Sequence, residues 1–161
     1  MARVYLETSF FSECCTIRTG EIARGRRAIS LQWWQTDARR FDLFVSSEVV
    51  RELSSPEFPE SVRTPTLEML EGISQLALAD EVLGVAAILV REHVMPGPAS
   101  EGDALHVAAS LVHRIEHLVT WNQQHLANQN KRTHLRVVCA RMGYLLPEIV
   151  TPDLMFLGDS T

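Results

Sequence analysis

The stretch Val4-Tyr5-Leu6-Glu7-Thr8-Ser9 places an acidic residue at the end of a short apolar run. The β-branched and aromatic residues before Glu7 are typical of a buried strand, and Thr8 or Ser9 can cap a helix that follows it. We therefore expect a strand, a turn and a helix at the start of the chain. Ligands of open parallel sheets bind outside the strand exits, which makes Glu7 a candidate site residue.

Three further stretches also join an apolar segment to an oxygen-bearing side chain: Phe44-Val45-Ser46-Ser47-Glu48, Gly102-Asp103-Ala104-Leu105-His106 and Leu118-Val119-Thr120-Trp121-Asn122. Together with Glu7 they supply three carboxylates and one amide. Oxygen donors of this kind are the ligands that hard divalent cations prefer, so the set favours Mg²⁺ or Mn²⁺ over Zn²⁺. A site of this composition indicates phosphodiester chemistry.

The rest of the chain alternates between strand and helix patterns. Strands are expected over 42–46, 75–79, 117–120 and 149–150, and helices over 21–38, from Ser47, and over 66–72, 81–93, 102–113, 122–128 and 132–142. A proline-rich loop is expected over 56–65. This alternation predicts an α/β fold, in which right-handed crossovers join parallel strands and helices cover both faces of the sheet.

This topology lets the candidate side chains meet. Glu7 and Asn122 follow predicted strands directly, Glu48 follows one a turn later, and Asp103 lies near the start of a helix. The carboxyl edge of the sheet is where these positions can converge.

The composition is that of one globular domain, which we expect to span residues 1–161. The hydrophobic fraction of 46% is enough for a core without disulfides, and the three cysteines lack metal-ligand spacing, so we expect reduced thiols. No apolar run approaches the about 20 residues of a membrane span, and the N-terminus lacks a signal-peptide pattern. We therefore expect a cytoplasmic protein with no membrane partner.

The net charge of −5 is not that of a protein with a broad nucleic-acid surface. Basic residues nevertheless gather between Arg24 and Arg40. Within this segment Arg24, Arg26 and Arg27 are the candidate contacts to RNA phosphates.

The four motifs resemble, in order and spacing, those of PIN-domain nucleases, and the similarity extends across nearly the whole chain. Val4 to Ser9 resembles the opening Asp-Thr-Ser strand of that family, and Ser47-Glu48 resembles its second acidic position. The segment from Asp103 to Ala108 resembles the third position, and Leu118 to Asn122 resembles the fourth. The most similar branch is that of the VapC-like toxins of bacterial toxin–antitoxin pairs.

The resemblance implies a three-layer α/β/α domain with a parallel sheet of about five strands. It also implies an Mg²⁺- or Mn²⁺-dependent endoribonuclease that forms homodimers and is inhibited by a cognate antitoxin protein. The catalytic positions it assigns are Glu7, Glu48, Asp103 and Asn122, with the first three as metal ligands. Supporting roles in holding a carboxylate or a phosphate are expected for Thr8, Ser9, His106 and Thr120.

Two of these positions depart from the family pattern. Glu7 stands where Asp is usual, which keeps the charge but moves the carboxylate by about one bond length. Asn122 stands where Asp is common, so the cluster carries three negative charges instead of four. Lower charge weakens divalent-ion affinity, and we expect one metal ion before substrate binds.

Two other functions are compatible with the sequence. A degenerate PIN-like module that binds RNA or a protein is suggested by Glu7, Asn122 and the acidic net charge. A different doubly wound phosphate-handling enzyme, such as a phosphatase or receiver-like domain, is suggested by Thr8-Ser9 after an acidic strand end. The latter lacks a glycine-rich phosphate loop, and the sole lysine is Lys131.

Overall fold

The computed structural model describes residues 1–122, 126 and 129–158 and has an all-parallel sheet of five strands at its centre. The strand order across the sheet is β3-β2-β1-β4-β5. The strands are β1 (Arg3–Leu6), β2 (Asp42–Ser46), β3 (Ser74–Leu76), β4 (His117–Val119) and β5 (Glu148–Val150). The expected α/β fold with a parallel sheet is confirmed.

Strand β1 occupies the middle of the sheet, where both of its faces are covered. Its residues Val4, Tyr5 and Leu6 are fully buried, which explains why the strand is apolar without alternation. In the register, Tyr5 lies opposite Phe44 of β2 on one side and Leu118 of β4 on the other. The exit of β1 is therefore flanked by the exits of β2 and β4.

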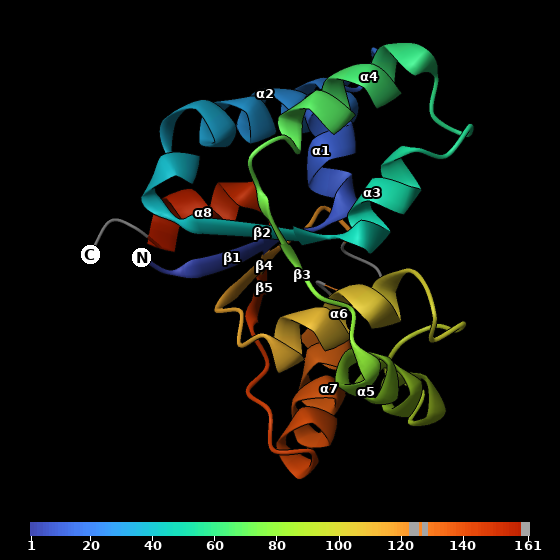
Figure 1. Cartoon of the computed structure of the whole chain (residues 1–161). Coiled ribbons are helices and arrows are strands. Elements are labelled where there is room, and N and C mark those ends of the chain that lie inside the picture. Colours follow the sequence, from blue (N-terminus) through green and yellow to red (C-terminus); the bar gives the residue numbers. More distant parts are fainter. Residues whose placement is uncertain (123–125, 127–128, 159–161) are drawn as a thin grey trace.

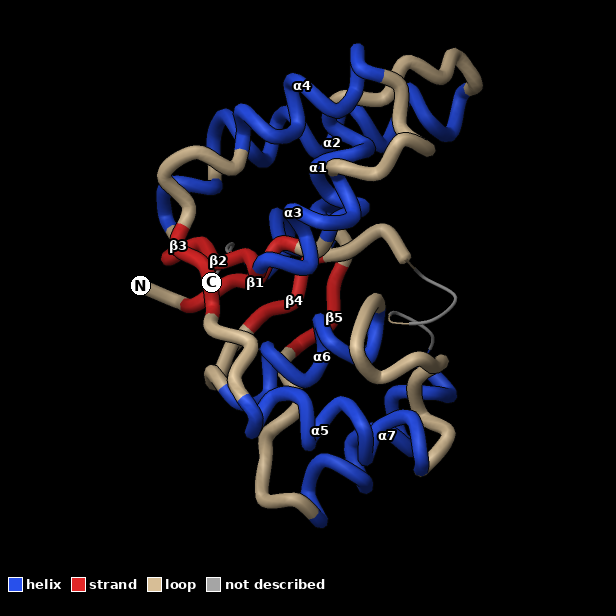
Figure 2. The backbone as a smooth tube through the Cα atoms, turned by 45° about the vertical axis from the view of Figure 1, so that its right-hand side comes forward, coloured by secondary structure: helices blue, strands red, loops and turns tan. Residues whose placement is uncertain are grey.

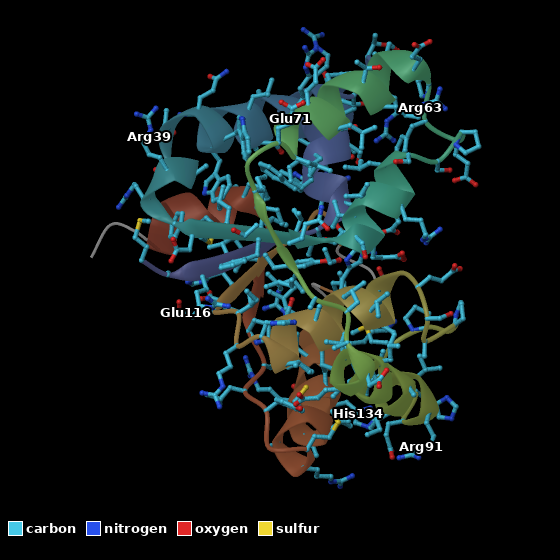
Figure 3. The ribbon with its side chains drawn as sticks, viewed as in Figure 1. Arg39, Arg63, Glu71, Arg91, Glu116 and His134 are labelled. Atoms are coloured by element: carbon cyan, nitrogen blue, oxygen red, sulfur yellow. The ribbon has the colours of Figure 1, made fainter. Side chains whose placement is uncertain are left out.

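Helices cover both faces of the sheet, giving three layers (Figures 1 and 2). One face carries α1 (Thr8–Cys14), α2 (Glu21–Thr36), α4 (Glu60–Met69) and α8 (Pro152–Gly158). The other carries α5 (Asp80–Arg91), α6 (Asp103–Val112) and α7 (Gln129–Arg141). Helix α3 (Ser47–Leu53) leaves β2 at the carboxyl edge, and a single 3₁₀ turn, η1 (Ala38–Arg40), precedes β2. Exposed charged side chains such as Arg39 and Arg91 point away from the sheet on opposite layers (Figure 3).

Aromatic side chains fasten α1 and α2 to each other. The Phe10 ring meets the Trp33 ring edge-on at a centroid distance of 5.4 Å, and Trp33 stacks on Phe41 at 5.9 Å. Phe10 and Trp33 are fully buried. Because Glu7 is the N-cap of α1, this packing also fixes the position of the first candidate site residue.

The structure differs from the sequence-based expectation in the start of one helix and in one additional helix. The proline-rich loop over 56–65 is shorter than expected, since α4 already begins at Glu60 and contains Pro65. Pro65 removes one backbone donor without ending the helix. The buried Thr66 hydroxyl donates to the carbonyls of Val62 and Arg63, both at 2.9 Å. Helix α8 was not predicted.

Three further expectations concern the helix over 122–128, the cysteines and membrane-spanning segments. The helix expected over 122–128 lies largely outside the described residues. All three cysteines are free thiols, as expected. Over the described residues, no helix is both long enough and apolar enough to span a membrane.

Candidate metal centre

Glu7, Glu52 and His106 meet at the carboxyl edge of the sheet, although they come from three separate elements. One carboxylate oxygen from each glutamate and one ring nitrogen of His106 all lie within 4.8 Å of one another. Glu7 is 5% exposed and His106 is fully buried, while Glu52 is half-buried. Two carboxylates with one imidazole are a suitable donor set for a divalent cation such as Mn²⁺, and the carboxylates also suit Mg²⁺.

Glu7 is the N-cap of α1, and its carboxylate belongs to this cluster. Its Oε2 accepts a hydrogen bond from the Ser9 backbone N–H at 2.9 Å, from the Ser9 hydroxyl, and from the Thr120 hydroxyl at 2.9 Å. The helix cap expected from Thr8 or Ser9 is thus supplied by Glu7 itself. Burial raises the pKa of the Glu7 carboxyl, while the charge of His106 and the hydrogen bonds from Ser9 and Thr120 oppose the rise.

Glu52 is the site residue that the sequence reasoning missed. It lies one turn beyond Glu48 on α3, accepts a hydrogen bond from the Thr8 hydroxyl at 2.7 Å and is paired with Nε2 of His106. Burial alone would raise the pKa of the Glu52 carboxyl, but the hydrogen bonds from His106 and Thr8 hold it below its ordinary value. A signal was present, because residues four apart share a helix face and both Glu48 and Glu52 are acidic.

The structure places Glu48 in a different set of contacts. Its carboxylate accepts a two-pronged pair from Arg51, with Nη2 to Oε2 at 2.8 Å, and Oε2 also accepts the Gly102 N–H at 2.6 Å. Glu48 is 3% exposed, so these partners compensate a buried charge. A role for Glu48 as a metal ligand stays a prediction. In the structure, Glu48 holds the segment that begins α6 through its hydrogen bond from the Gly102 N–H.

The hydrogen bond between Glu48 and Gly102 positions Asp103. Gly102 has φ +72°, a left-handed conformation that a side chain would strain, and it forms the N-cap of α6. The half-buried Asp103 follows directly and receives the Asn122 amide, with Nδ2 at 3.2 Å from Oδ1 and 3.4 Å from Oδ2. Thr120 accepts the Asn122 backbone N–H at 2.9 Å and also bonds Glu7, so Asn122 and Glu7 share a partner. Glu7, Asp103 and Asn122 therefore lie in one hydrogen-bonded region.

A buried chain of hydrogen bonds holds His106. Its Nδ1 lies 2.6 Å from the Tyr5 hydroxyl, which lies 2.8 Å from the Ser46 hydroxyl. Burial would lower the pKa of His106, but the hydrogen bond to Glu52 and the charges of Glu7, Glu52 and Asp103 raise it above the ordinary value. His106 is thus fixed on both ring nitrogens, with one directed at Glu52.

The expected RNA contacts divide into two kinds. Arg24 and Arg27 are exposed on α2. Arg26 is less exposed and lies over the Trp121 ring, with Cζ 5.2 Å from the ring centroid. Of these three arginines, Arg26 is the one with a described contact to Trp121, whose backbone N–H donates to Ser9 beside Glu7.

Sequence comparison finds no matching family model and no matching curated protein. Structural comparison finds the Mycobacterium tuberculosis toxin VapC20, described as cleaving the sarcin–ricin loop, with a TM-score of 0.57 and 15% sequence identity. The match covers 78% of this chain and 95% of the toxin chain. At this identity the likeness shows the fold, and the chain therefore has the fold of a VapC toxin.

Proposed function

We propose that this protein is a divalent-metal-dependent endoribonuclease that hydrolyses phosphodiester bonds of RNA. One observation carries the proposal: Glu7, Glu52 and His106 converge at the carboxyl edge of a parallel sheet, beside the hydrogen-bonded pair of Asp103 and Asn122. The fold shared with VapC20 supports RNA as the substrate.

Mg²⁺ or Mn²⁺ would be held by Glu7, Glu52 and Asp103. The donor chemistry fits, because carboxylate oxygens are ligands for both ions and the first two are already within 4.8 Å of each other. When bound, such an ion lowers the pKa of a water molecule and stabilises charge on the scissile phosphate.

The surrounding residues preorganise these carboxylates. Ser9 and Thr120 fix one oxygen of Glu7, and Thr8 with His106 fixes one oxygen of Glu52. The Asn122 amide donates to Asp103 without adding a fourth negative charge. Asp103, which is only half-buried, is the carboxylate we assign to orient the attacking water.

Metal removal tests the proposal. Purified protein is expected to cleave total cellular RNA with Mn²⁺ or Mg²⁺, to lose cleavage in EDTA and to regain it when Mn²⁺ is restored in excess. Products are resolved on a denaturing gel beside a mock purification from cells without the gene. Cleavage that continues unchanged in EDTA would contradict a metal-dependent mechanism.

A binding module without catalysis is the second candidate. It is favoured by Asn122, which donates a hydrogen bond where the family pattern supplies a carboxylate, and by the raised pKa of Glu7, which favours the uncharged form. RNA binding by a folded protein that cleaves no RNA at any Mn²⁺ concentration would support this alternative. Turnover with bound Mn²⁺ would eliminate it.

As a toxin of a toxin–antitoxin pair, the protein would act in the cytoplasm as a homodimer and be blocked by a cognate antitoxin. The acidic cluster supports such inhibition, because an inserted arginine would pair with carboxylates that otherwise bind the metal. Purification from the native host without any small companion protein would count against this part of the proposal.

The chain from Ser46 through Tyr5 to His106 gives a prediction about metal affinity. Tyr5→Phe removes only the hydroxyl that bonds Nδ1 of His106, so the ring that orients Glu52 loses one of its two anchors. Loss of such an outer partner typically weakens metal binding, and we expect the Mn²⁺ dissociation constant to rise about tenfold. Titration followed by the electron paramagnetic resonance signal of free Mn²⁺ measures it.

Tyr144→Phe is the matched control for this measurement. The Tyr144 hydroxyl donates to Glu81, away from the metal centre, and the variant also loses one phenol oxygen. Equal Mn²⁺ affinity in both variants would show that the Tyr5 hydroxyl has no part in holding the site.

A further inference from the structure

A short series of contacts connects Arg26 to the metal centre. Its guanidinium covers the ring of Trp121, with Cζ 5.2 Å from the centroid. The Trp121 backbone N–H donates to the Ser9 hydroxyl at 2.8 Å, and that hydroxyl donates to Glu7. The Trp121 ring is itself fixed, since its Nε1 donates to the buried Ser30 hydroxyl at 2.8 Å. Arg26 therefore sits on a rigid platform beside the first carboxylate.

The guanidinium donors of Arg26 are free for a ligand as far as the described residues extend. The protein contacts found there are the ring contact with Trp121 and an ion pair with Glu13 at 3.8 Å, which is longer than a hydrogen bond. Stacking uses the face of the guanidinium, whereas its N–H groups point outward in the plane. A phosphate can thus bind in that plane while the stack on Trp121 persists.

Glu13 does not depend on Arg26 for its compensation. The Glu13 side chain is 7% exposed and is paired more closely with Arg18, whose Nη2 lies 3.0 Å from Oε1. If Arg26 turned toward a ligand, Glu13 would keep its closer partner, so no buried charge would be left unpaired. Arg18 also offsets the repulsion that Glu13 would exert on an incoming phosphate.

We infer that Arg26, seated on Trp121, binds a backbone phosphate of the RNA strand beside the scissile bond. The inference rests on the proposed ribonuclease function and deepens it, because it names the residue that holds the substrate on the α2 side of the metal centre. Arginine is suited to this role by its planar set of donors, which matches two phosphate oxygens at once. RNA is favoured over an acidic protein partner because contacts through Trp121 and Ser9 connect the guanidinium to Glu7 of the metal centre, where the RNA backbone would be cleaved.

The test compares Arg26→Gln with Arg24→Gln, two equal changes in charge on one helix. Arg24 is exposed and lies about 200° around α2 from Arg26, away from Trp121. Dissociation constants for a fluorescently labelled single-stranded RNA are measured by anisotropy in EDTA at several salt concentrations. KM and kcat are then measured with Mn²⁺.

For Arg26→Gln we expect RNA binding about tenfold weaker and a KM raised in proportion, with kcat nearly unchanged. The slope of log K against log salt should fall by about 0.7, the value for one phosphate contact on a single strand. Arg24 is also a candidate phosphate contact, but no described contact connects it to the metal centre, so Arg24→Gln should weaken RNA binding by only about twofold, clearly less than Arg26→Gln. Arg26→Lys, which keeps the charge and loses the planar donors, should lie between the two.

Each other outcome is decisive. Equal effects of Arg26→Gln and Arg24→Gln, with cleavage intact, would overturn the inference and leave the proposed function standing. A wild-type protein that neither binds nor cleaves RNA would overturn both. Unchanged RNA binding by Arg26→Gln, together with lost binding of a poly-glutamate peptide, would assign Arg26 to a protein partner and refute the RNA contact.

Discussion

Glu52→Gln is expected to lower the rate of metal-dependent RNA cleavage by about 10²- to 10³-fold, because a metal ligand supplies several kcal/mol of transition-state stabilisation. The amide keeps the size of the side chain and an oxygen for the Thr8 hydroxyl, which donates to Oε1 at 2.7 Å. The fold should therefore survive, and the loss should fall on kcat and on Mn²⁺ affinity. Single-turnover cleavage of a labelled RNA measures the rate.

Glu48→Gln is the matched control for this prediction. Both residues lie on α3 one turn apart, but Glu48 is engaged by Arg51 and by the Gly102 N–H. An amide oxygen at position 48 still accepts the Gly102 N–H, so we expect a loss of less than about tenfold in rate. The opposite order, in which Glu48→Gln is the more damaging change, would restore Glu48 as the metal ligand and remove Glu52 from that role.

Asp103→Asn is expected to reduce cleavage by about the same 10²- to 10³-fold, since it removes a charge that holds the metal and orients water. The new amide can still meet the Asn122 side chain, so the protein should remain folded. Cleavage of total RNA with Mn²⁺, beside wild-type protein prepared identically, provides the measurement. Full activity in Asp103→Asn would refute the assignment of the site.

Asn122→Asp adds a negative charge to the site, whereas Asp103→Asn removes one. A carboxylate at position 122 would face Asp103, where the amide now donates at 3.2 Å, so the metal-free protein should melt at a lower temperature. The fourth negative charge should tighten Mn²⁺ binding by about tenfold, and Mn²⁺ should raise the melting temperature more than in wild type. A variant with wild-type Mn²⁺ affinity would show that the charge at position 122 does not limit metal binding.

The middle of the sheet could be predicted from local patterns because β1 and β4 are apolar and mostly buried. The edge strand β3 is polar and mostly exposed, so its pattern is weaker. Glu7 was predictable as an edge residue because it directly follows β1, and Asn122 because it comes shortly after the end of β4. The choice between Glu48 and Glu52 was not available from the sequence. Both lie on the same face of α3, and which turn meets β1 and α6 depends on how the helix is tilted.

Two other features depend on partners distant in sequence. Arg51 neutralises Glu48 locally, but the Gly102 N–H that completes this contact comes from the loop before α6. His106 becomes part of the site because Tyr5 and Glu52 occupy its two ring nitrogens. A lone histidine on an apolar helix gives no indication of such partners.

The central place of β1 has a consequence for when activity can arise during synthesis. Glu7 leaves the ribosome 113 residues before Thr120, whose hydroxyl fixes its carboxylate. β4, the strand that pairs with β1 on the side opposite β2, is also translated well after β1. A partly translated chain therefore lacks an assembled centre. If the protein acts as the proposed ribonuclease, the interval before β4 emerges is a time in which the nascent chain has no assembled centre with which to cleave RNA.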